Sequence, residues 1–279
     1  MAEELGVPLN QIKVISNDTD LTPYDLGSWG SRTTYMSGNA VLAAARDTKK
    51  TILAVAAEMF SAGPEDIVMQ DGEIFVKGSA DVKHSLAQVA EYAVDKRGLP
   101  ISGRGNFNDK LPAGITIKDA FIKNIATFSF GTQVADVEVN PETGEVKVLS
   151  VVAAHESGKT INITMAEGQI EGSVVQGIGY ALMEKMVLDN GRVVNDGFLD
   201  YKIPNIGDIP EIKAILVETG DPHGPLGAKG IGEPGLVPTA AAIANAIYHA
   251  TGVRMKELPI TPEKLLKALK EKQNEGRAE

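Results

Sequence analysis

Apolar residues recur at helical spacing in several parts of this chain. Between residues 36 and 60 the apolar positions fall on one face of a helix that spans most of that segment. These positions are Val41, Leu42, Ala45, Ile52, Val55, Ala56 and Met59. The same spacing predicts helices over residues 85–96 and 164–186, and a helix that follows residue 235 and ends near residue 251. A last helix starts with Thr261 at the N-cap and Pro262 at N1.

Shorter apolar runs predict strands. Residues 67–70 and 73–76 flank Asp71-Gly72, a pair typical of a two-residue hairpin turn. Residues 127–153 predict two strands about a turn at 141–144, where imperfect alternation is typical of a sheet covered on both faces. The remaining predicted strands are a hairpin within 187–194, a strand over 212–217 and a short strand over 12–15.

Together these elements predict an α+β fold of mixed sheets with helices packed on one face. We expect two subdomains, residues 1–115 and 116–279, that meet near residues 114–124. The polar, glycine-rich segment 98–111 is the best candidate for a surface excursion. Residues 2–5 resemble the last turn of a helix that ends at Gly6, so we expect the chain to begin within a fold.

Composition narrows the chemistry. The 279 residues include 43% hydrophobic ones, which is enough for a sizeable core. A net charge of −10 argues against nucleic-acid and anionic-membrane partners. The absence of cysteine excludes disulfides, iron–sulfur ligation and thiolate zinc sites. The four histidines have no ligand-like spacing, so no protein metal ligand is predicted. Without a signal peptide or a membrane-spanning run, a cytoplasmic location is expected.

The densest cluster of glycine and proline lies at residues 224–235, directly before an apolar helix, and it carries one acid, Glu233. Gly230 and Gly235 fit the ends of a dinucleotide-binding G-x-G-x-x-G motif, but the preceding strand ends too early and Pro234 interrupts the motif. Two interpretations then stay open. The loop is a tight turn with a solvated acid, or it is a ligand cradle with a catalytic carboxylate.

Two further segments each allow two interpretations. Residues 27–34 combine glycine, hydroxyl side chains and Arg32 ahead of a helix, which suits either capping by a hydroxyl or an anion site. The helix over 164–186 contains Gly168, Gly172, Gly177 and Gly179, each costing up to ~1 kcal/mol relative to alanine. Close helix packing would explain them, and so would ligand access to the backbone and to Gln169.

Four stretches, in order, resemble the xanthine dehydrogenase/aldehyde oxidase family of molybdenum hydroxylases. They are GSWGSRTTYMSGNA, FSFGTQVADVEVNPETGEVKV, GQIEGSVVQGIGYAL and the segment from DYKIP to GAKGIGEPG. Together the four stretches resemble the C-terminal third of the family's molybdopterin-binding large subunit. The family's earlier glycine-rich motifs and its iron–sulfur and flavin modules do not occur in this sequence.

The resemblance implies roles for individual residues. Glu233 takes the place of the catalytic glutamate, which accepts a proton from the attacking oxygen, and we expect Pro234 and the apolar helix to bury it. The molybdenum is held by the pterin and not by a protein side chain. The residues implied to contact or line the cofactor site are Ser28, Gly30, Ser31, Arg32, Thr33, Gln169, Gly230 and Ile231. The cofactor would lie between the first loop, the start of the Gln169 helix and the Glu233 loop.

The resemblance also implies partners. The expected cofactor is molybdenum–molybdopterin in its cytosine dinucleotide form, with iron–sulfur clusters and FAD on partner chains. Expected partners are the N-terminal part of the molybdenum subunit, a 2Fe–2S subunit and an FAD subunit, so the chain should be inactive alone. The substrate would be a small molecule with an electron-poor carbon, such as a purine, N-heterocycle, aldehyde or aromatic thioester. The first stretch favours bacterial members of the hydroxybenzoyl-CoA reductase or N-heterocycle type. The alternative is a non-catalytic assembly module.

Overall fold

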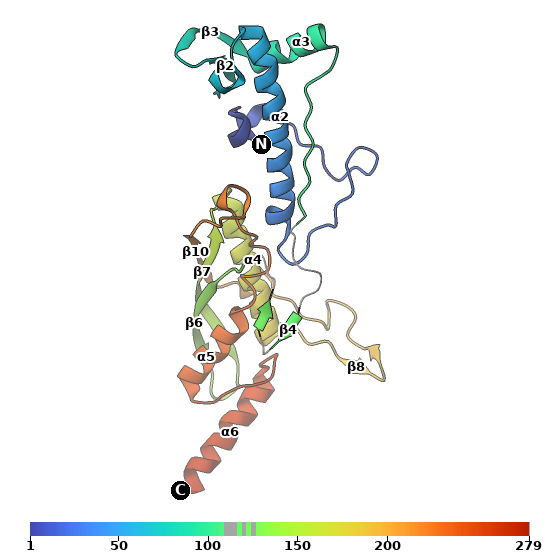
Figure 1. Ribbon diagram of the computed structural model, residues 1–279. Coiled ribbons are helices and arrows are strands. Elements are labelled where there is room, and N and C mark those ends of the chain that lie inside the picture. The colour runs from blue at the N-terminus through green and yellow to red at the C-terminus, as the bar shows by residue number, and fades with distance from the viewer. Residues whose placement is uncertain (109–115, 119–120, 124–126, 279) are drawn as a thin grey trace. The chain divides into compact units, whose positions relative to one another are not determined.

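A computed structural model describes residues 1–108, 116–118, 121–123 and 127–278 (Figure 1). The chain forms two compact units, Met1–Asn124 and Ile125–Glu279. The predicted subdomain boundary lies between residues 115 and 116, and residue 115 is outside the described residues. Each unit is described here by itself.

The first unit is built around one long helix. Its elements in chain order are α1 (Ala2–Leu5), η1 (Leu9–Gln11), α2 (Thr33–Phe60), η2 (Pro64–Asp66), β1 (Ile67–Gln70), β2 (Glu73–Val76), β3 (Ser79–Ser85), α3 (Leu86–Arg97), β4 (Thr116–Lys118) and β5 (Phe121–Lys123). Strands β1, β2 and β3 form an antiparallel sheet in that order. The core of this unit joins Ile52 and Val55 of α2 to Ile74 of β2 and Val89 of α3.

Local sequence signals set most boundaries in this unit. The helix that ends at Leu5 is followed by Gly6 in the left-handed conformation, and Ser85 caps α3 in a reciprocal capping box with Gln88. The predicted strand over residues 12–15 is wrong. Val14 and Ile15 are exposed, and no described strand lies beside them to complete a ladder.

The glycine-rich segment after α3 is mostly exposed, as expected, yet its described part runs back along α2 (Figure 1). A Cβ on Gly103 or Gly105 would collide with the α2 backbone near Ala44, so this close approach requires glycine. The backbone N–H of Arg104 donates to Asp47 at 3.0 Å. The segment is therefore docked on the helix. Residues 109–111 lie outside the described residues.

The second unit is a three-stranded sheet with helices. Its elements are β6 (Gly131–Val139), β7 (Val146–Gly158), α4 (Ile163–Leu182), β8 (Leu188–Asp189), β9 (Arg192–Val193), η3 (Ile206–Asp208), β10 (Glu211–Glu218), η4 (Pro225–Gly227), α5 (Thr239–Thr251) and α6 (Pro262–Ala278). The strand order is β10–β7–β6, with β10 parallel and β6 antiparallel to β7. The mixed sheet predicted from the sequence is confirmed.

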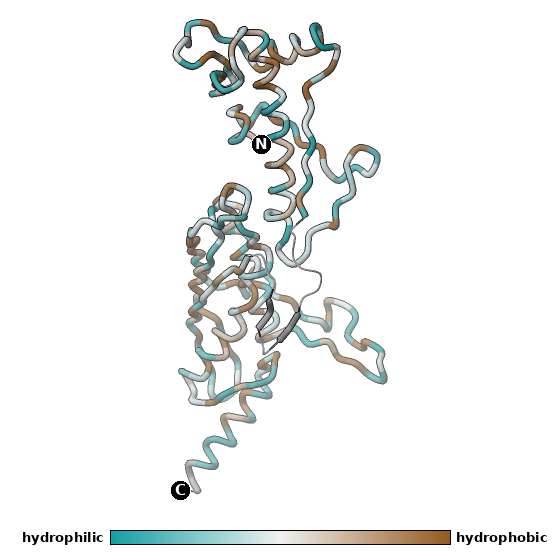
Figure 2. Tube along the Cα trace, viewed as in Figure 1, coloured by the Kyte–Doolittle hydropathy of each residue, from teal (hydrophilic) through white to brown (hydrophobic). Residues whose placement is uncertain are grey.

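Helices α4 and α5 cover one face of this sheet, as predicted (Figure 1). Val151 and Ala153 of β7 meet Ile170 and Val174 of α4 and Ile243 of α5 in the core. The opposite face carries exposed side chains, which include Val134, Val152 and Ile215. Figure 2 shows apolar positions interspersed with polar ones along this unit. The interpretation of imperfect alternation as a sheet covered on both faces is therefore wrong for the described residues. No described helix has the length and apolar character needed to cross a membrane.

Candidate functional site

The loop from Gly224 to Gly235 joins β10 to α5 and is fastened to the end of β7. Gly158 pairs with Ala228 in an isolated antiparallel bridge. The N–H of Lys159 donates to the Gly227 carbonyl at 2.7 Å, and the N–H of Lys229 donates to the Ser157 carbonyl at 2.9 Å. Gly158 has φ +67°, and a Cβ there would collide with the Gly227 carbonyl, so this contact requires glycine. The first half of the loop is thus an extension of the sheet.

A buried ion pair reinforces this attachment. Lys229 Nζ lies 2.7 Å from Glu156 Oε2, and the two side chains are 9% and 6% exposed. The other carboxylate oxygen of Glu156 accepts hydrogen bonds from the Gly158 N–H at 2.7 Å and the Thr219 hydroxyl at 2.6 Å. Burial alone would raise the pKa of Glu156, but the hydrogen bonds from Lys229, Thr219 and Gly158 outweigh it and lower the pKa. Glu156 is therefore held as a carboxylate.

Asp221 closes the start of the loop. Its carboxylate accepts from the Thr127 hydroxyl at 2.7 Å and from the backbone N–H groups of His223 and Gly224, both at 2.8 Å. Burial opposes ionisation here as well, yet these three donors lower the pKa of Asp221. The loop is thus anchored by two buried carboxylates before it reaches the predicted site residues.

The second half of the loop is held through backbone carbonyls. Gln133 Nε2 donates to the Gly235 carbonyl at 2.6 Å, Ser129 Oγ donates to the Gly230 carbonyl at 3.4 Å, and Ser173 Oγ donates to the Gly232 carbonyl at 3.5 Å. Gly230 is buried, and Ile231 packs against the hydrophobic core. Glu233 is exposed, so the expectation that Pro234 and the helix bury it is wrong.

Beneath this half of the loop lies a buried histidine. His155 is fully buried, and its Nε2 lies 3.0 Å from Gln133 Nε2. An amide nitrogen donates and does not accept, so the imidazole Nε2 accepts this hydrogen bond and the ring is neutral. Burial lowers the pKa of His155 in keeping with a neutral ring. Among the described residues, no group of three or more His, Asp or Glu side chains could hold a metal ion.

The rejection of a dinucleotide-binding motif is confirmed. Strand β10 ends at Glu218, well before Gly230, and helix α5 begins only at Thr239. The motif requires a strand directly before its first glycine and a helix start within it.

The four glycines of α4 divide into two pairs. A Cβ on Gly177 would collide with Thr239, and one on Gly179 would collide with Glu184 and meet Pro204, so this pair serves close packing. A Cβ on Gly168 or Gly172 would meet no described atom within 4 Å. Gly168, Gln169, Gly172 and Gln176 are all exposed and share one face at helical spacing. Close packing therefore accounts for Gly177 and Gly179, whereas ligand access at Gly168 and Gly172 stays a prediction.

The segment before α2 is held by short-range contacts. Arg32 Nη1 donates to the Gly27 carbonyl at 2.8 Å and lies 3.7 Å from Asp25, while Thr33 Oγ1 donates to Ser28 Oγ at 2.8 Å. Gly30 and Ser31 both have positive φ. Arg32 occupies the N-cap of α2, and no side chain caps the helix. The interpretation as capping by a hydroxyl is therefore wrong, and the α2 N-terminus keeps the partial positive charge that attracts anions.

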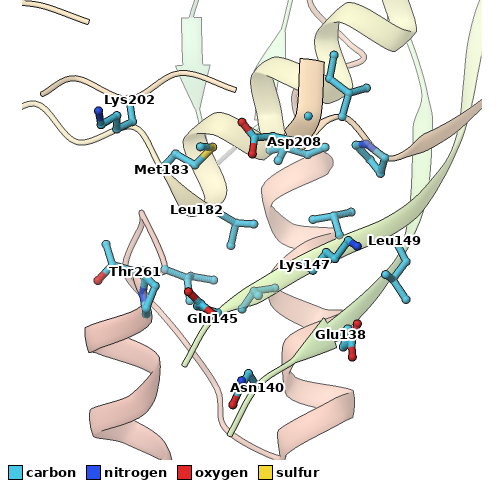
Figure 3. Close-up of a pocket in the computed structure, with 18 of the residues that line it drawn as sticks. Glu138, Asn140, Glu145, Lys147, Leu149, Leu182, Met183, Lys202, Asp208 and Thr261 are labelled. Carbon is cyan, nitrogen blue, oxygen red and sulfur yellow. The ribbon is translucent and has the colours of Figure 1, made fainter. Parts of the chain in front are cut away.

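A cavity of about 1130 Å³ lies at the far end of the β6–β7 hairpin, beside the start of α6 (Figure 3). Its wall includes Asn140 and Glu145 near the hairpin turn, Met183 just after α4, Asp208, and Thr261. None of the predicted site residues lines it. The Glu233 loop is attached near the start of β6 and the end of β7, so the cavity and the candidate site are separate.

The chain is similar to known proteins over nearly its whole length. Residues 1–210 match the family model described as the molybdopterin cofactor-binding domain. The chain belongs to this family. It is 35% identical over 95% of its length to the xanthine dehydrogenase molybdenum-binding subunit of Escherichia coli O157:H7, and 37% identical over 96% to the nicotine 6-hydroxylase large subunit of Paenarthrobacter nicotinovorans. These alignments cover 34% and 33% of those relatives, so the chain spans about a third of their length.

Solved structures agree with this family membership. The crystal structure of quinoline 2-oxidoreductase from Pseudomonas putida 86 superimposes with a TM-score of 0.83 and 27% identity, over 97% of this chain and 34% of that one. The α+β fold and the resemblance to the molybdopterin-binding part of the xanthine dehydrogenase family, both predicted from the sequence, are confirmed.

Sequence reasoning missed the residues that support the Glu233 loop: Gln133, Glu156, Lys229 and Asp221. Lys229 was visible as a lone cation inside a glycine-rich stretch that also carries an acid. Glu156 and Gln133 gave no local signal, because each lies on a strand far from the loop in sequence.

Proposed function

We propose that this chain is the C-terminal part of a molybdenum hydroxylase subunit, with Glu233 as the catalytic base. The observation that carries the proposal is the geometry of the Glu233 loop. Its backbone is fixed by donors from β6, from α4 and from the segment before β6, while the carboxylate is left exposed beside a buried Gly230. A simple solvated turn would not need three separate elements to hold its carbonyl groups. Such rigid placement is what a positioned acid–base group requires.

The described residues fit a large planar cofactor. The exposed α4 face offers two stretches of open backbone at Gly168 and Gly172 on either side of Gln169, whose amide can both donate and accept. In the first unit, the N-terminus of α2 with Ser28, Gly30, Ser31, Arg32 and Thr33 suits a phosphate group, because backbone N–H groups at a helix start favour anions. When bound, the molybdenum cofactor supplies the redox chemistry.

Within that site each residue has a distinct task. Gln169 and the backbone beside it bind and orient the pterin. Gly230 and Ile231 shape the wall next to Glu233, and Ile231 ties that wall to the core. Glu233 accepts a proton from the oxygen nucleophile as this attacks the substrate, a contribution of typically about 10²–10⁴-fold in rate. The substrate is a small molecule with an electron-poor carbon, of the purine, N-heterocycle, aldehyde or aromatic thioester type.

The finer assignments belong to the same proposal. The cofactor is the cytosine dinucleotide form, and the partners are the N-terminal part of the molybdenum subunit, a 2Fe–2S chain and an FAD chain in the cytoplasm. The two relatives described above are named as a molybdenum-binding subunit and a large subunit, which fits a heteromeric complex. The competing function is an assembly module that packs against a separate catalytic subunit.

Metal and nucleotide analysis separates these two functions. The chain is purified alone and together with the rest of its complex, and molybdenum and released CMP are measured in both. Molybdenum with CMP only in the complex is the expected result. A well-folded complex without molybdenum would favour the assembly module.

The role of Glu233 is tested in the same complex. Glu233→Gln should lower kcat by about 10³-fold while molybdenum content stays unchanged, because the amide cannot take up the proton. Glu211→Gln is the matched control, since Glu211 is an exposed acid at the start of β10 and should leave kcat unchanged. Full activity of Glu233→Gln would overturn the assignment.

A further inference from the structure

The Lys229–Glu156 pair is a buried and fully hydrogen-bonded ion pair that the proposed chemistry leaves unused. Besides its 2.7 Å contact with Glu156, Lys229 Nζ donates to the Phe128 carbonyl at 2.8 Å and lies 5.8 Å from the Phe130 ring centroid. Both oxygens of Glu156 have donors. The two bonds of Lys229 join the loop to β7 and to the chain that enters β6, and the bonds from Gly158 and Thr219 hold the Glu156 carboxylate in place.

Stability alone does not account for such a pair. Taking two charges out of water costs free energy that their attraction repays only with near-ideal geometry, and a well-packed apolar pair of similar size often stabilises a fold as much. An ion pair instead makes the loop conformation specific. Lys229 can reach both Glu156 and the Phe128 carbonyl in only one register of the loop. The pair therefore specifies one position of the loop.

The position it specifies is that of Glu233, four residues further along the chain. Between Lys229 and Thr239 the loop contains three glycines, which have wide conformational freedom. The hydrogen bonds to the Gly230 and Gly232 carbonyls are long, at 3.4 and 3.5 Å, and are weaker than the bond of 2.6 Å to Gly235. On the N-terminal side of Glu233, the nearest firm contacts are those of Lys229, namely its backbone N–H bond to the Ser157 carbonyl at 2.9 Å and its side-chain pair with Glu156.

We propose that Lys229 and Glu156 are positioning residues that fix the loop so that Glu233 stays in its working place. This inference rests on the proposed role of Glu233, but its structural part can be measured without any activity. It assigns the pair to catalysis through Glu233 and gives neither residue contact with substrate.

Hydrogen exchange on the full chain tests the structural part. Lys229→Met keeps the apolar stem and removes the charge, and Glu156→Gln keeps the shape and removes the opposite charge. In both variants, amides in residues 228–236 should exchange at least about tenfold faster, while amides of β7 in residues 148–153 keep their protection. Lys229→Arg should restore slow exchange. Lys213→Met, which removes an exposed lysine from β10, is the control.

The decisive comparison is between Lys229→Met and Lys213→Met. Equal exchange in residues 228–236 would overturn the proposal. If Lys229→Met fails to fold, the isosteric Glu156→Gln gives the same test, and unchanged exchange in that variant would overturn the proposal as well.

Kinetics of the assembled complex test the catalytic part. Lys229→Met should lower kcat at least about tenfold with KM within twofold and molybdenum retained, and Lys229→Arg should recover most of kcat. A loosened loop with full activity would refute the positioning role, provided that Glu233→Gln is inactive. Full activity of Glu233→Gln would instead refute the proposed function, while the exchange data would still report on the anchor.

Discussion

The two loops that resemble cofactor-site motifs are held in opposite ways. In the loop over residues 27–33, the bonds of Gly27, Arg32 and Thr33 go to near neighbours in sequence, which are Asp25, Gly27 and Ser28, and most of its side chains are exposed. The loop over residues 224–235 bonds to residues 59 to 102 positions away in sequence. Long-range bonds fix a loop before any ligand arrives, whereas short-range bonds let it adjust. We infer that the second loop presents a preformed base and that the first is shaped by what it binds.

The largest expected effect is on stability, and it tests this contrast with one alanine substitution at each loop. Gly158 and Gly30 both have positive φ, but a Cβ on Gly158 would collide with the Gly227 carbonyl, whereas a Cβ on Gly30 would meet no described atom within 4 Å. Gly158→Ala should destabilise the second unit by roughly 2–5 kcal/mol, because a left-handed alanine costs about 1–2 kcal/mol and the collision with the Gly227 carbonyl adds about 1–3 kcal/mol. Gly30→Ala should cost only about 1 kcal/mol. Urea unfolding of the two variants gives both values.

Equal losses in the two variants would show that the second loop is no more tightly built than the first. Gly191→Ala serves as a control within the second unit, since Gly191 has positive φ in the β8–β9 turn and open space around it. It should match Gly30→Ala.

The same contrast explains what the sequence could predict. Helical spacing and turn residues located α2, α3, α4 and β10 within a few residues, because these signals act over short distances. The motif containing Glu233 was visible as a glycine-rich string. Its support by Gln133 and Glu156, and the exposure of the carboxylate, depend on which strands become neighbours, and no local pattern encodes that. For the same reason the exposed strand predicted over residues 12–15 was wrong.

The glycines of α4 give the next prediction. Gly177→Ala should destabilise the chain by about 1–3 kcal/mol, since the added methyl group collides with buried Thr239. Gly168→Ala should instead stabilise it by about 0.5–1 kcal/mol, because alanine favours the helix and the space is open. Thermal unfolding of the isolated chain measures both effects.

Cofactor content then sharpens the assignment of Gly168. In the assembled complex, Gly168→Ala should lower bound molybdenum although it raises stability, since the methyl group would cover backbone that the pterin needs. Gly191→Ala, in the open β8–β9 turn of the same unit, is the control and should leave molybdenum unchanged. A stabilised Gly168→Ala variant with full molybdenum would remove this face from the proposed site.

The smallest expected effect concerns pH and the histidine beneath the loop. Burial lowers the pKa of His155, so the unfolded chain takes up a proton at a higher pH than the folded one. Its contribution to stability is therefore present above the unfolded pKa of about 6.5 and is lost as the pH falls toward the lower, folded value. The loss cannot exceed about 1.4 kcal/mol per pH unit, because one proton is involved.

The loss of stability in this pH range is assigned to His155 because the neighbouring carboxylates take up protons only at lower pH. Hydrogen bonds lower the pKa of Glu156 and of Asp221 from the ordinary carboxyl values, so their contributions stay in place between pH 7.5 and 5.5 and are lost only under more acidic conditions. Urea unfolding at pH 7.5 and 5.5 should show a fall in stability that His155→Gln reduces. His249→Gln, which removes an exposed histidine of α5, should keep it. If the His155→Gln variant loses as much stability between pH 7.5 and 5.5 as the unchanged chain, the acid sensitivity of this unit arises from other groups. The neutral ring beneath Gln133 then contributes nothing to holding the loop in place.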